Sequence, residues 1–425
     1  MKPTAGGKRT SAGAGRWALP LGVLILFIDG YDLFVLGTVG PSLLAYKPWG
    51  AGPPTLGLLG SVTAFGMPLG AFVAGRASDT WGRRSPLVAT LTWVSLCMIL
   101  AGLAPNLTVF GLGRFLTGIG IGALTPLVVA HVADWAPPHR RTLRVGLALT
   151  GIAVGGLVVA FVGRAVLPGV PFQSLFLVGA IPLLLIPVCW NAMPAGLPDA
   201  DIEVSVHAED AAAAGEPLRQ LFSPRYRAAT ILFAVAGFFG LVLVYGASTW
   251  LPTLMVQAGY DLRSALEFAM AFNGGAILGT IAAAMIADRG HLKSSTVICF
   301  LSAAVAMLVL SSEQARWVIL VMSAVAGLGT LGTQNLVNGY VAHFFPARLR
   351  GSALGVSLGL ARFGSILGPS YVTLIIVLFA VPAAGFYGFV LPAVLGAIAI
   401  GMVPAARRPI ASGPVDAARA SGEAR

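Results

Sequence analysis

Charged residues are scarce in this chain of 425 residues, where Asp, Glu, Lys and Arg make up only 10%. An ordinary soluble domain has about 25%. Hydrophobic residues make up 57%, and the mean hydropathy is +0.86. A soluble protein of this length needs far more charge to cover its surface. The composition therefore excludes a soluble enzyme, a disordered chain and a nucleic-acid-binding protein, and it predicts an all-α polytopic membrane protein.

Cysteine is also rare. Each of the three cysteines lies in a separate apolar run, with no Cys or His at ligand spacing: Cys97, Cys189 and Cys299. This pattern favours small buried residues over a disulfide framework or a metal site. No nucleotide-binding loop or hydrolytic triad is present in the sequence. We therefore expect a protein that is not an enzyme and has no cofactor or metal.

Long apolar runs dominate instead. A bilayer core needs about 20 apolar residues per helix, and the first run is too long for the core of a signal peptide. Twelve runs qualify: 17–40, 55–75, 86–105, 107–130, 142–163, 169–191, 228–251, 265–287, 294–311, 317–341, 351–378 and 383–404. The sequence thus predicts an N-terminal tail (1–16), a six-helix bundle (17–191), a hydrophilic linker (192–227), a second six-helix bundle (228–404) and a C-terminal tail (405–425).

The basic residues predict the orientation, because cytoplasmic segments of membrane proteins are enriched in Lys and Arg. Of the 27 basic residues, 21 lie in the tails, the linker and the loops on that same side. Four lie in the alternate loops, namely Lys47, Arg164, Arg263 and Arg316. This asymmetry predicts cytoplasmic N- and C-termini.

The two predicted bundles are related in sequence. Asp79 and Asp288 are 209 residues apart, and the same offset relates Pro137 to Pro346 in corresponding loops. Two parallel repeats with a substrate site between them near mid-membrane are typical of secondary transporters.

The loop after the second span reads Gly-Arg-Ala-Ser-Asp-Thr-Trp-Gly-Arg-Arg at 75–84. It matches G-x-x-x-D-x-x-G-R-R, and it resembles the signature loop of the major facilitator superfamily. An acidic, Pro and Arg element follows the fourth span, and a degraded copy of the signature loop follows the eighth. We expect a gating role for these loops, and the residues concerned are Asp79, Gly82, Arg83, Arg84, Asp134, Arg141, Asp288 and Arg289.

Ionisable residues inside the spans are the most informative, because each is costly to bury and needs a partner or a function. Asp29 and Asp32 are three residues apart and so share a helical face. Two carboxylates this close cannot both ionise easily in a low dielectric, which suits a proton carrier. At about 1.5 Å per residue, Asp32 lies at the depth of Arg114, and Asp29 at that of Arg362.

These motifs resemble those of one branch of the superfamily, the aromatic acid:proton symporters. The resemblance rests on Asp-Gly-Tyr-Asp at 29–32, Gly-Arg-Phe at 113–115, Trp-Leu-Pro at 250–252 and Ala-Arg-Phe-Gly at 361–364. It implies a monomeric symporter in the bacterial inner membrane that imports benzoate- or hydroxybenzoate-like acids. It further implies that Asp29 and Asp32 carry the proton, and that Arg114 and Arg362 bind the carboxylate.

An aromatic acid also needs an apolar slot for its ring and a few polar contacts. The ring candidates are Tyr31, Phe34, Tyr245 and Trp250, and the candidates for contacts with ring substituents are Asn273, Gln334, Asn335 and Asn338. The tenth span places its three amides on one predicted face.

Three alternatives remain. A non-aromatic organic acid or a muconate-like anion would use the same charges. A proton-driven exporter is also possible, although the two membrane arginines favour an anionic substrate over a cationic drug. A non-transporting membrane sensor would not need Asp29 and Asp32 in the bilayer.

Overall fold

The computed structural model describes residues 17–137, 141–167, 169–193, 215–289, 291–381 and 383–404. Within these ranges, twelve helical stretches are long and apolar enough to cross a membrane, as predicted. The first six are α2 (Ala18–Ala45), α3 (Pro53–Trp81), α4 (Arg84–Gly102), α5 (Leu107–Asp134), α6 (Arg141–Val166) and a broken span made of α7 (Ser174–Val178), η3 (Ile181–Leu185) and α8 (Ile186–Ala192). The second six are α11 (Arg227–Gln257), α12 (Leu262–Arg289), α13 (Leu292–Leu310), a composite of α14 (Arg316–Gly327), η4 (Leu328–Gly332) and α15 (Thr333–Phe344), then α16 (Ala347–Phe379) and α17 (Ala384–Met402).

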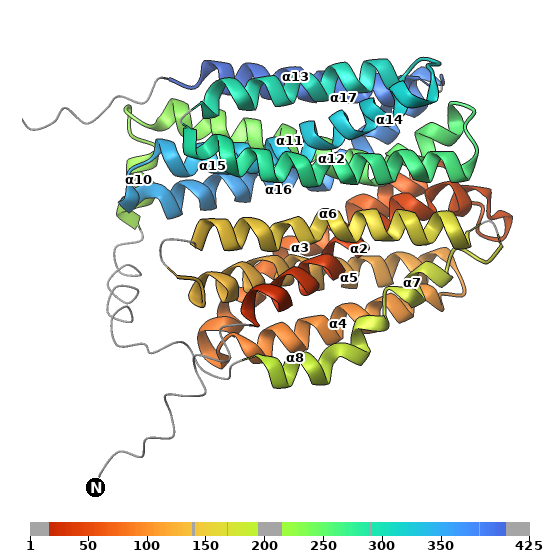
Figure 1. The fold of residues 1–425 in the computed structure, drawn as a ribbon, viewed down its shortest axis with the longest axis horizontal. Coiled ribbons are helices and arrows are strands. Elements are labelled where there is room, and N and C mark those ends of the chain that lie inside the picture. The colour runs from red at the N-terminus through yellow and green to blue at the C-terminus, as the bar shows by residue number, and fades with distance from the viewer. Residues whose placement is uncertain are drawn as a thin grey trace, which may run out of the picture.

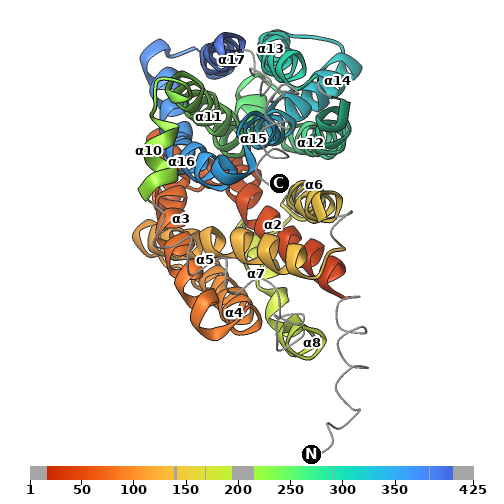
Figure 2. The same cartoon turned by 90° about the vertical axis from the view of Figure 1, so that its left-hand side faces the viewer.

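These helices form two bundles (Figures 1 and 2). Helices α2 to α8 form the N-bundle, in which α2 packs on α6 and α3 packs on α5. Helices α11 to α17 form the C-bundle, in which α11 packs on α16 and α13 packs on α17. The linker helix α10 (Gly215–Leu221) packs against α16, and the predicted linker residues 194–214 lie outside the described residues.

Two spans are less regular than the sequence predicts. The sixth is interrupted by a 3-10 turn at Ile181–Leu185, where Pro182 occupies the first turn. The tenth contains a π-helical turn at Leu328–Gly332. Such a turn inserts an extra residue into the helix and is frequent at functional sites, but no residue type announces it.

The paired aspartates of α2 lie where α2 and α6 are in very close contact. A Cβ atom on Gly30 would lie 1.9 Å from the carbonyl oxygen of Ile152. Only glycine permits this approach, so Gly30 fixes the position of Asp29 and Asp32 relative to the rest of the N-bundle.

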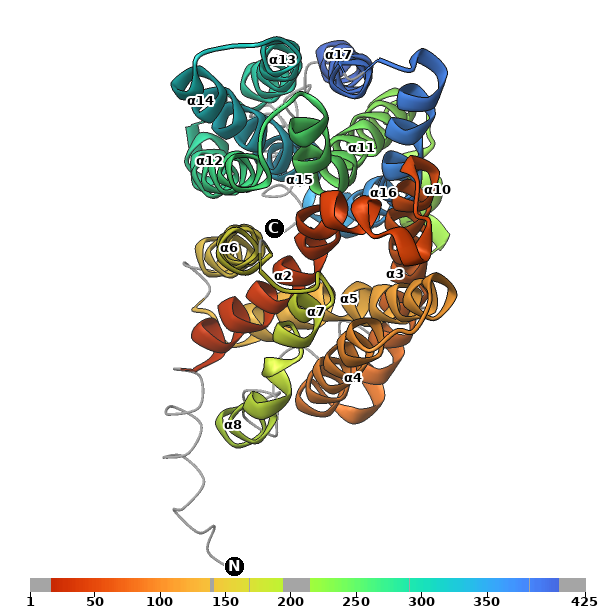
Figure 3. The same ribbon diagram turned by 90° about the vertical axis from the view of Figure 1, so that its right-hand side faces the viewer.

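The bundles meet mainly toward one end. We call the end that carries Ala18, α10 and Met402 the linker end, seen in Figure 2, and the opposite end the far end, seen in Figure 3. Toward the far end, a Cβ on Gly37 of α2 would lie 1.9 Å from the Ser248 carbonyl oxygen of α11, and the hydroxyls of Ser61 and Ser370 lie 2.7 Å apart.

Toward the linker end, the bundles separate. Four glycines of α6 and α16 would find no other atom within 4 Å of an added Cβ, namely Gly146, Gly351, Gly355 and Gly359. Close contact at one end and open space at the other describe one state of a rocking two-bundle protein.

One ion-pair cluster joins the bundles at the far end. Glu267 of α12 accepts from Arg164 of α6 at 2.6 Å, and its other oxygen pairs with Arg316 of α14. The first pair crosses between bundles, whereas the second lies within the C-bundle. Among the described residues, the Arg164 pair is the one ion pair that links the two bundles.

We predict that Arg164→Ala opens the far end more often. A partly exposed ion pair contributes about 1 kcal/mol, which corresponds to a roughly five-fold change in the ratio of open to closed molecules. Spin labels at Leu103 of the N-bundle and Ser312 of the C-bundle, both exposed, report the separation by pulsed electron paramagnetic resonance.

Arg316→Ala is the matched control, because it removes the partner of Glu267 that lies in the same bundle. It should leave the distance distribution unchanged. Equal shifts in both variants, or a shift in neither, would contradict a role for the inter-bundle pair.

Candidate functional site

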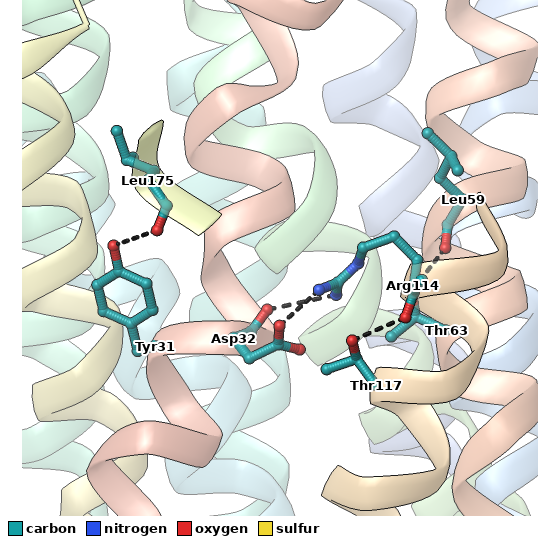
Figure 4. A network of polar contacts seen from close by, with 8 residues as sticks. Tyr31, Asp32, Leu59, Thr63, Arg114, Thr117 and Leu175 are labelled. Carbon is teal, nitrogen blue, oxygen red and sulfur yellow. Dashed lines mark hydrogen bonds and ion pairs between the residues drawn. The ribbon is translucent and has the colours of Figure 1, made fainter. Parts of the chain in front are cut away.

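A buried ion pair lies near the middle of the N-bundle. Arg114 of α5 donates from Nη1 to Asp32 Oδ1 at 2.5 Å, and from Nη2 to the Asp32 carbonyl oxygen at 3.4 Å (Figure 4). Each side chain is 1% exposed. The structure confirms the pairing predicted from the depths of these residues. The guanidinium compensates the Asp32 charge, so this pair can remain ionised without water.

The second aspartate has a different partner. Thr125 of α5 donates a 2.6 Å hydrogen bond to Asp29 Oδ2, and Asp29 is 4% exposed. Among the described residues, Asp29 forms no ion pair. Both aspartates therefore face α5, as their spacing predicts, but only Asp32 is neutralised by a paired cation.

The other membrane arginine lies on α16 and reaches across to the N-bundle. Arg362 Nη1 lies 3.4 Å from the Tyr245 hydroxyl and 3.6 Å from Met67 Sδ of α3. The Tyr245 hydroxyl in turn lies 3.2 Å from the same sulfur. In the described part of the chain, no carboxylate pairs with Arg362. The two arginines are thus unlike: one holds a carboxylate and the other holds a phenol and a thioether.

A small cavity lies between the bundles beside these groups. Its volume is about 10 Å³, and Arg114, Met67 and Tyr245 contribute to its lining. This volume holds about one water molecule, whereas ligand pockets measure about 300 Å³ or more. A ligand ring can therefore occupy this cavity only if some of these side chains move.

Of the four aromatic candidates, Tyr245 lies at this cavity and the others have different environments. Tyr31 donates to the Leu175 carbonyl oxygen at 2.8 Å within the N-bundle (Figure 4). Trp250 is fully buried and donates to the Pro369 carbonyl oxygen at 2.9 Å within the C-bundle. Because the polar atom of each ring bonds to backbone, these two rings hold neighbouring helices together. Phe34 packs edge-to-face with Phe272 at 6.4 Å.

The amide candidates are distributed over the C-bundle. Gln334 donates to Asn338 at 3.4 Å, whereas Asn335 donates to Thr280 of α12 at 3.1 Å. The three amides therefore do not share one face as predicted, because Gln334 and Asn335 are consecutive and point about 100° apart. Asn273 donates to its own helix at Ala269, and its Oδ1 atom is buried with no partner among the described residues.

The predicted gating loops lie at the linker end. Arg83 donates to Asp134 at 3.0 Å and also contacts the Ser78 hydroxyl. The Arg84 guanidinium lies 4.0 Å from the ring centre of Trp190. Gly82 has a φ of 71°, which favours glycine. The other gating candidates have side chains outside the described part of the structure, and these are Asp79, Arg141, Asp288 and Arg289.

Two residues at the site, Thr125 and Met67, are not predicted from the sequence. Thr125 is 11 residues, about three turns, from Arg114, so it lies on the same face of α5. A polar residue on the same face of α5 as Arg114 could therefore have been noticed as a partner for an aspartate of α2. Met67 gives no such signal, because a methionine in a membrane span is ordinarily a packing residue.

Two bundles of membrane spans with ionisable residues inside the spans are typical of a secondary transporter. The chain belongs to the major facilitator superfamily, whose sequence profile matches residues 22–369.

Named relatives cover most of the chain. It is 35% identical to a gentisate transporter of Corynebacterium glutamicum over 393 residues, covering 91% of this chain and 87% of that one. It is 30% identical to a benzoate transport protein of Acinetobacter baylyi, covering 90% and 88%. A 4-hydroxybenzoate transporter of Pseudomonas putida is 28% identical, with 81% and 82% covered.

Solved structures agree in fold. A D-xylose-proton symporter matches with a TM-score of 0.72 and 18% identity, covering 91% of this chain and 97% of that one. A bacterial homologue of the lysosomal transporter Spinster, inward-facing and unoccupied, matches with a TM-score of 0.70 and 17% identity, covering 92% and 95%. At these identities the likeness concerns the fold alone.

The contrast between the two arginines predicts a difference in stability. Arg114→Ala leaves Asp32 buried and unpaired, which costs about 3–5 kcal/mol. Arg362→Ala leaves no carboxylate unpaired, so its cost should be much smaller. Thermal unfolding of the detergent-purified variants measures both effects.

A double variant, Asp32→Asn with Arg114→Gln, removes both charges and should recover part of the stability lost in Arg114→Ala. Equal loss of stability in Arg114→Ala and Arg362→Ala would contradict the assigned pairing.

Proposed function

We propose that this protein imports small aromatic carboxylates of the benzoate or hydroxybenzoate type, together with protons, by alternating access. The observation that carries the proposal is Arg362, a half-buried guanidinium on a membrane-spanning helix, which lies between the bundles and pairs with no carboxylate among the described residues. A cation in this position is costly unless something neutralises it during the cycle. An anionic substrate does so.

The substrate's carboxylate binds Arg362, because a guanidinium forms two parallel, charge-assisted hydrogen bonds to a carboxylate. The Tyr245 phenol lies next to this group and offers a ring face and a polar tip. The relatives named for gentisate, benzoate and 4-hydroxybenzoate support the substrate class, since each of these acids pairs one carboxylate with one small ring.

The coupling proton binds the aspartates of α2. Protonation of Asp32 neutralises the charge that holds Arg114, and so loosens the contact between α2 and α5. Asp29 accepts from Thr125 and has no paired cation, so it takes a proton without breaking an ion pair. Either event changes the charge of the site into which the anion moves, and this links proton and substrate.

The distribution of basic residues supports a cytoplasmic linker end and hence cytoplasmic termini in a bacterial inner membrane. In this orientation, the far end closed by Gly37 and Ser61 faces the periplasm. The open space at the linker end then belongs to the state that releases substrate inside. One chain contains both bundles and the whole site, which supports a monomer as the transporting unit.

Transport into proteoliposomes tests the proposal. Labelled benzoate or 4-hydroxybenzoate should accumulate when the outside is acidic, and a protonophore should abolish the accumulation. Arg362→Ala should lower uptake by roughly 30-fold or more, since removal of a charged partner at a desolvated site costs 2–5 kcal/mol. Arg263→Ala, an exposed arginine at the far end, is the control that should transport normally.

Asp29→Asn separates coupling from binding, because the amide keeps an acceptor for Thr125 but cannot carry a proton. It should lose uphill accumulation and retain exchange of labelled for unlabelled substrate. Normal accumulation by Asp29→Asn and Arg362→Ala would overturn the site. Accumulation of a non-aromatic acid such as muconate in preference to benzoate would overturn the substrate class.

A further inference from the structure

We infer that Met67 occupies the substrate's place at Arg362 when the site is empty, and that its side chain determines which ring substituents the site accepts. The inference rests on the proposed function and assigns a specificity-determining residue to that site. It is carried by the contacts of Met67, by the weakness of its sulfur as an acceptor, and by the lack of space around it.

Met67 connects the two bundles at the level of Arg362. Its side chain is 1% exposed and packs with Ala64 and Ile121 of the N-bundle and with Tyr245 and Ile366 of the C-bundle. These residues form a small cluster separate from the main hydrophobic core. Within the described residues, the acceptors that this cluster offers to Arg362 Nη1 are the Met67 sulfur and the Tyr245 hydroxyl.

The acceptor it provides is a poor one. A thioether sulfur is a weak hydrogen-bond acceptor, and a phenol oxygen is neutral. A carboxylate forms charge-assisted bonds about twice as strong as neutral ones. Of the two aspartates of α2, Asp32 pairs with Arg114, and Asp29 accepts from Thr125 without forming an ion pair with Arg362. A substrate carboxylate therefore displaces Met67 from Arg362 with a gain in binding energy.

The small volume of the cavity beside Met67 also indicates that this residue moves when a ligand binds. The cavity of about 10 Å³ that Met67 and Tyr245 line cannot hold a benzene ring, so a ring that occupies this position displaces a side chain. The Met67 backbone cannot move, because a Cβ on Gly122 of α5 would lie 2.0 Å from the Met67 carbonyl oxygen. The Met67 side chain can move, because methionine has three rotatable bonds. The neighbouring Ile121 is β-branched, so rotation about its χ1 angle is restricted.

The displaced side chain leaves the volume in which the ring and its substituents lie. The length of residue 67 then limits the bulk that a substrate can carry next to Arg362 and Tyr245. Methionine admits a bare or hydroxylated ring when it swings aside, and it competes with larger substituents for the same space. A shorter side chain at this position should therefore admit them.

Competition for labelled benzoate uptake in proteoliposomes tests the inference. The probes are unlabelled benzoate and 4-ethoxybenzoate, and the measured quantity is the ratio of their inhibition constants. In Met67→Ala, this ratio should shift by about 10-fold in favour of 4-ethoxybenzoate, since one or two methylene groups in an apolar pocket have effects of this size. Met67→Val should shift this ratio by a smaller factor in the same direction. If the alanine variant fails to fold, the ratio measured with the valine variant tests the inference.

Met98→Ala is the matched control. Met98 is also 1% exposed and lies in the N-bundle. Its terminal methyl group lies next to Gly179, and it is not part of the cluster around Met67. It should keep the wild-type ratio. An unchanged ratio in both Met67 variants would overturn the inference, as would an equal shift in Met98→Ala.

The result also separates this inference from the proposed function. If the wild-type protein takes up neither acid, the proposed function fails, and the role of Met67 fails with it. If the wild type takes up benzoate and the Met67 variants keep its selectivity, only the role of Met67 fails.

Discussion

The neutralisation of positive charge inside the membrane-spanning helices is the constraint on which the rest of this structure depends. Two guanidinium groups lie inside the membrane-spanning helices, where an unpaired charge is costly. Arg114 is neutralised within the protein by Asp32 at 2.5 Å. Arg362 forms no ion pair with a carboxylate in the described residues, and its Nη1 atom lies against a phenol and a thioether. Arg114 therefore holds α2 and α5 of the N-bundle together. Arg362, by contrast, favours the binding of an anion between the bundles.

The fold places Arg362 at the interface between the two bundles, where a bound anion can affect their relative movement. Arg362 belongs to the C-bundle, whereas Met67 and the two aspartates belong to the N-bundle. Close contact at Gly37 and the Arg164–Glu267 pair hold the far end together. An anion bound at Arg362 therefore touches both bundles at their junction, and a proton on α2 changes the charge on the opposite wall. In the proposed mechanism, proton and substrate thus act on one interface from its two sides.

Much of this could be predicted from the sequence. Twelve apolar runs predicted the twelve spans, and residue depth predicted the pairing of Asp32 with Arg114, because helix rise and bilayer thickness are fixed quantities. Periodicity also placed Asp29 and Asp32 on one face. These features follow from local geometry, which each helix carries in its own sequence.

Other features depend on contacts between helices distant in the chain. The π-helical turn at Leu328–Gly332 and the interrupted sixth span carry no residue pattern that fixes them. Tyr31 and Trp250 were predicted near the substrate, but their polar atoms bond to carbonyl oxygens of neighbouring helices within each bundle. Met67 was not noticed, because only the packed bundles bring its sulfur to Arg362.

The position of a bound substrate tests the central claim most directly. A structure determined with 4-bromobenzoate, located by the anomalous scattering of bromine, would show which arginine receives the carboxylate. The account predicts both carboxylate oxygens at about 2.7–2.9 Å from the Arg362 guanidinium, with the Met67 side chain displaced and Arg114 still paired with Asp32. A carboxylate bound to Arg114, with Arg362 still in contact with Met67 and Tyr245, would contradict it.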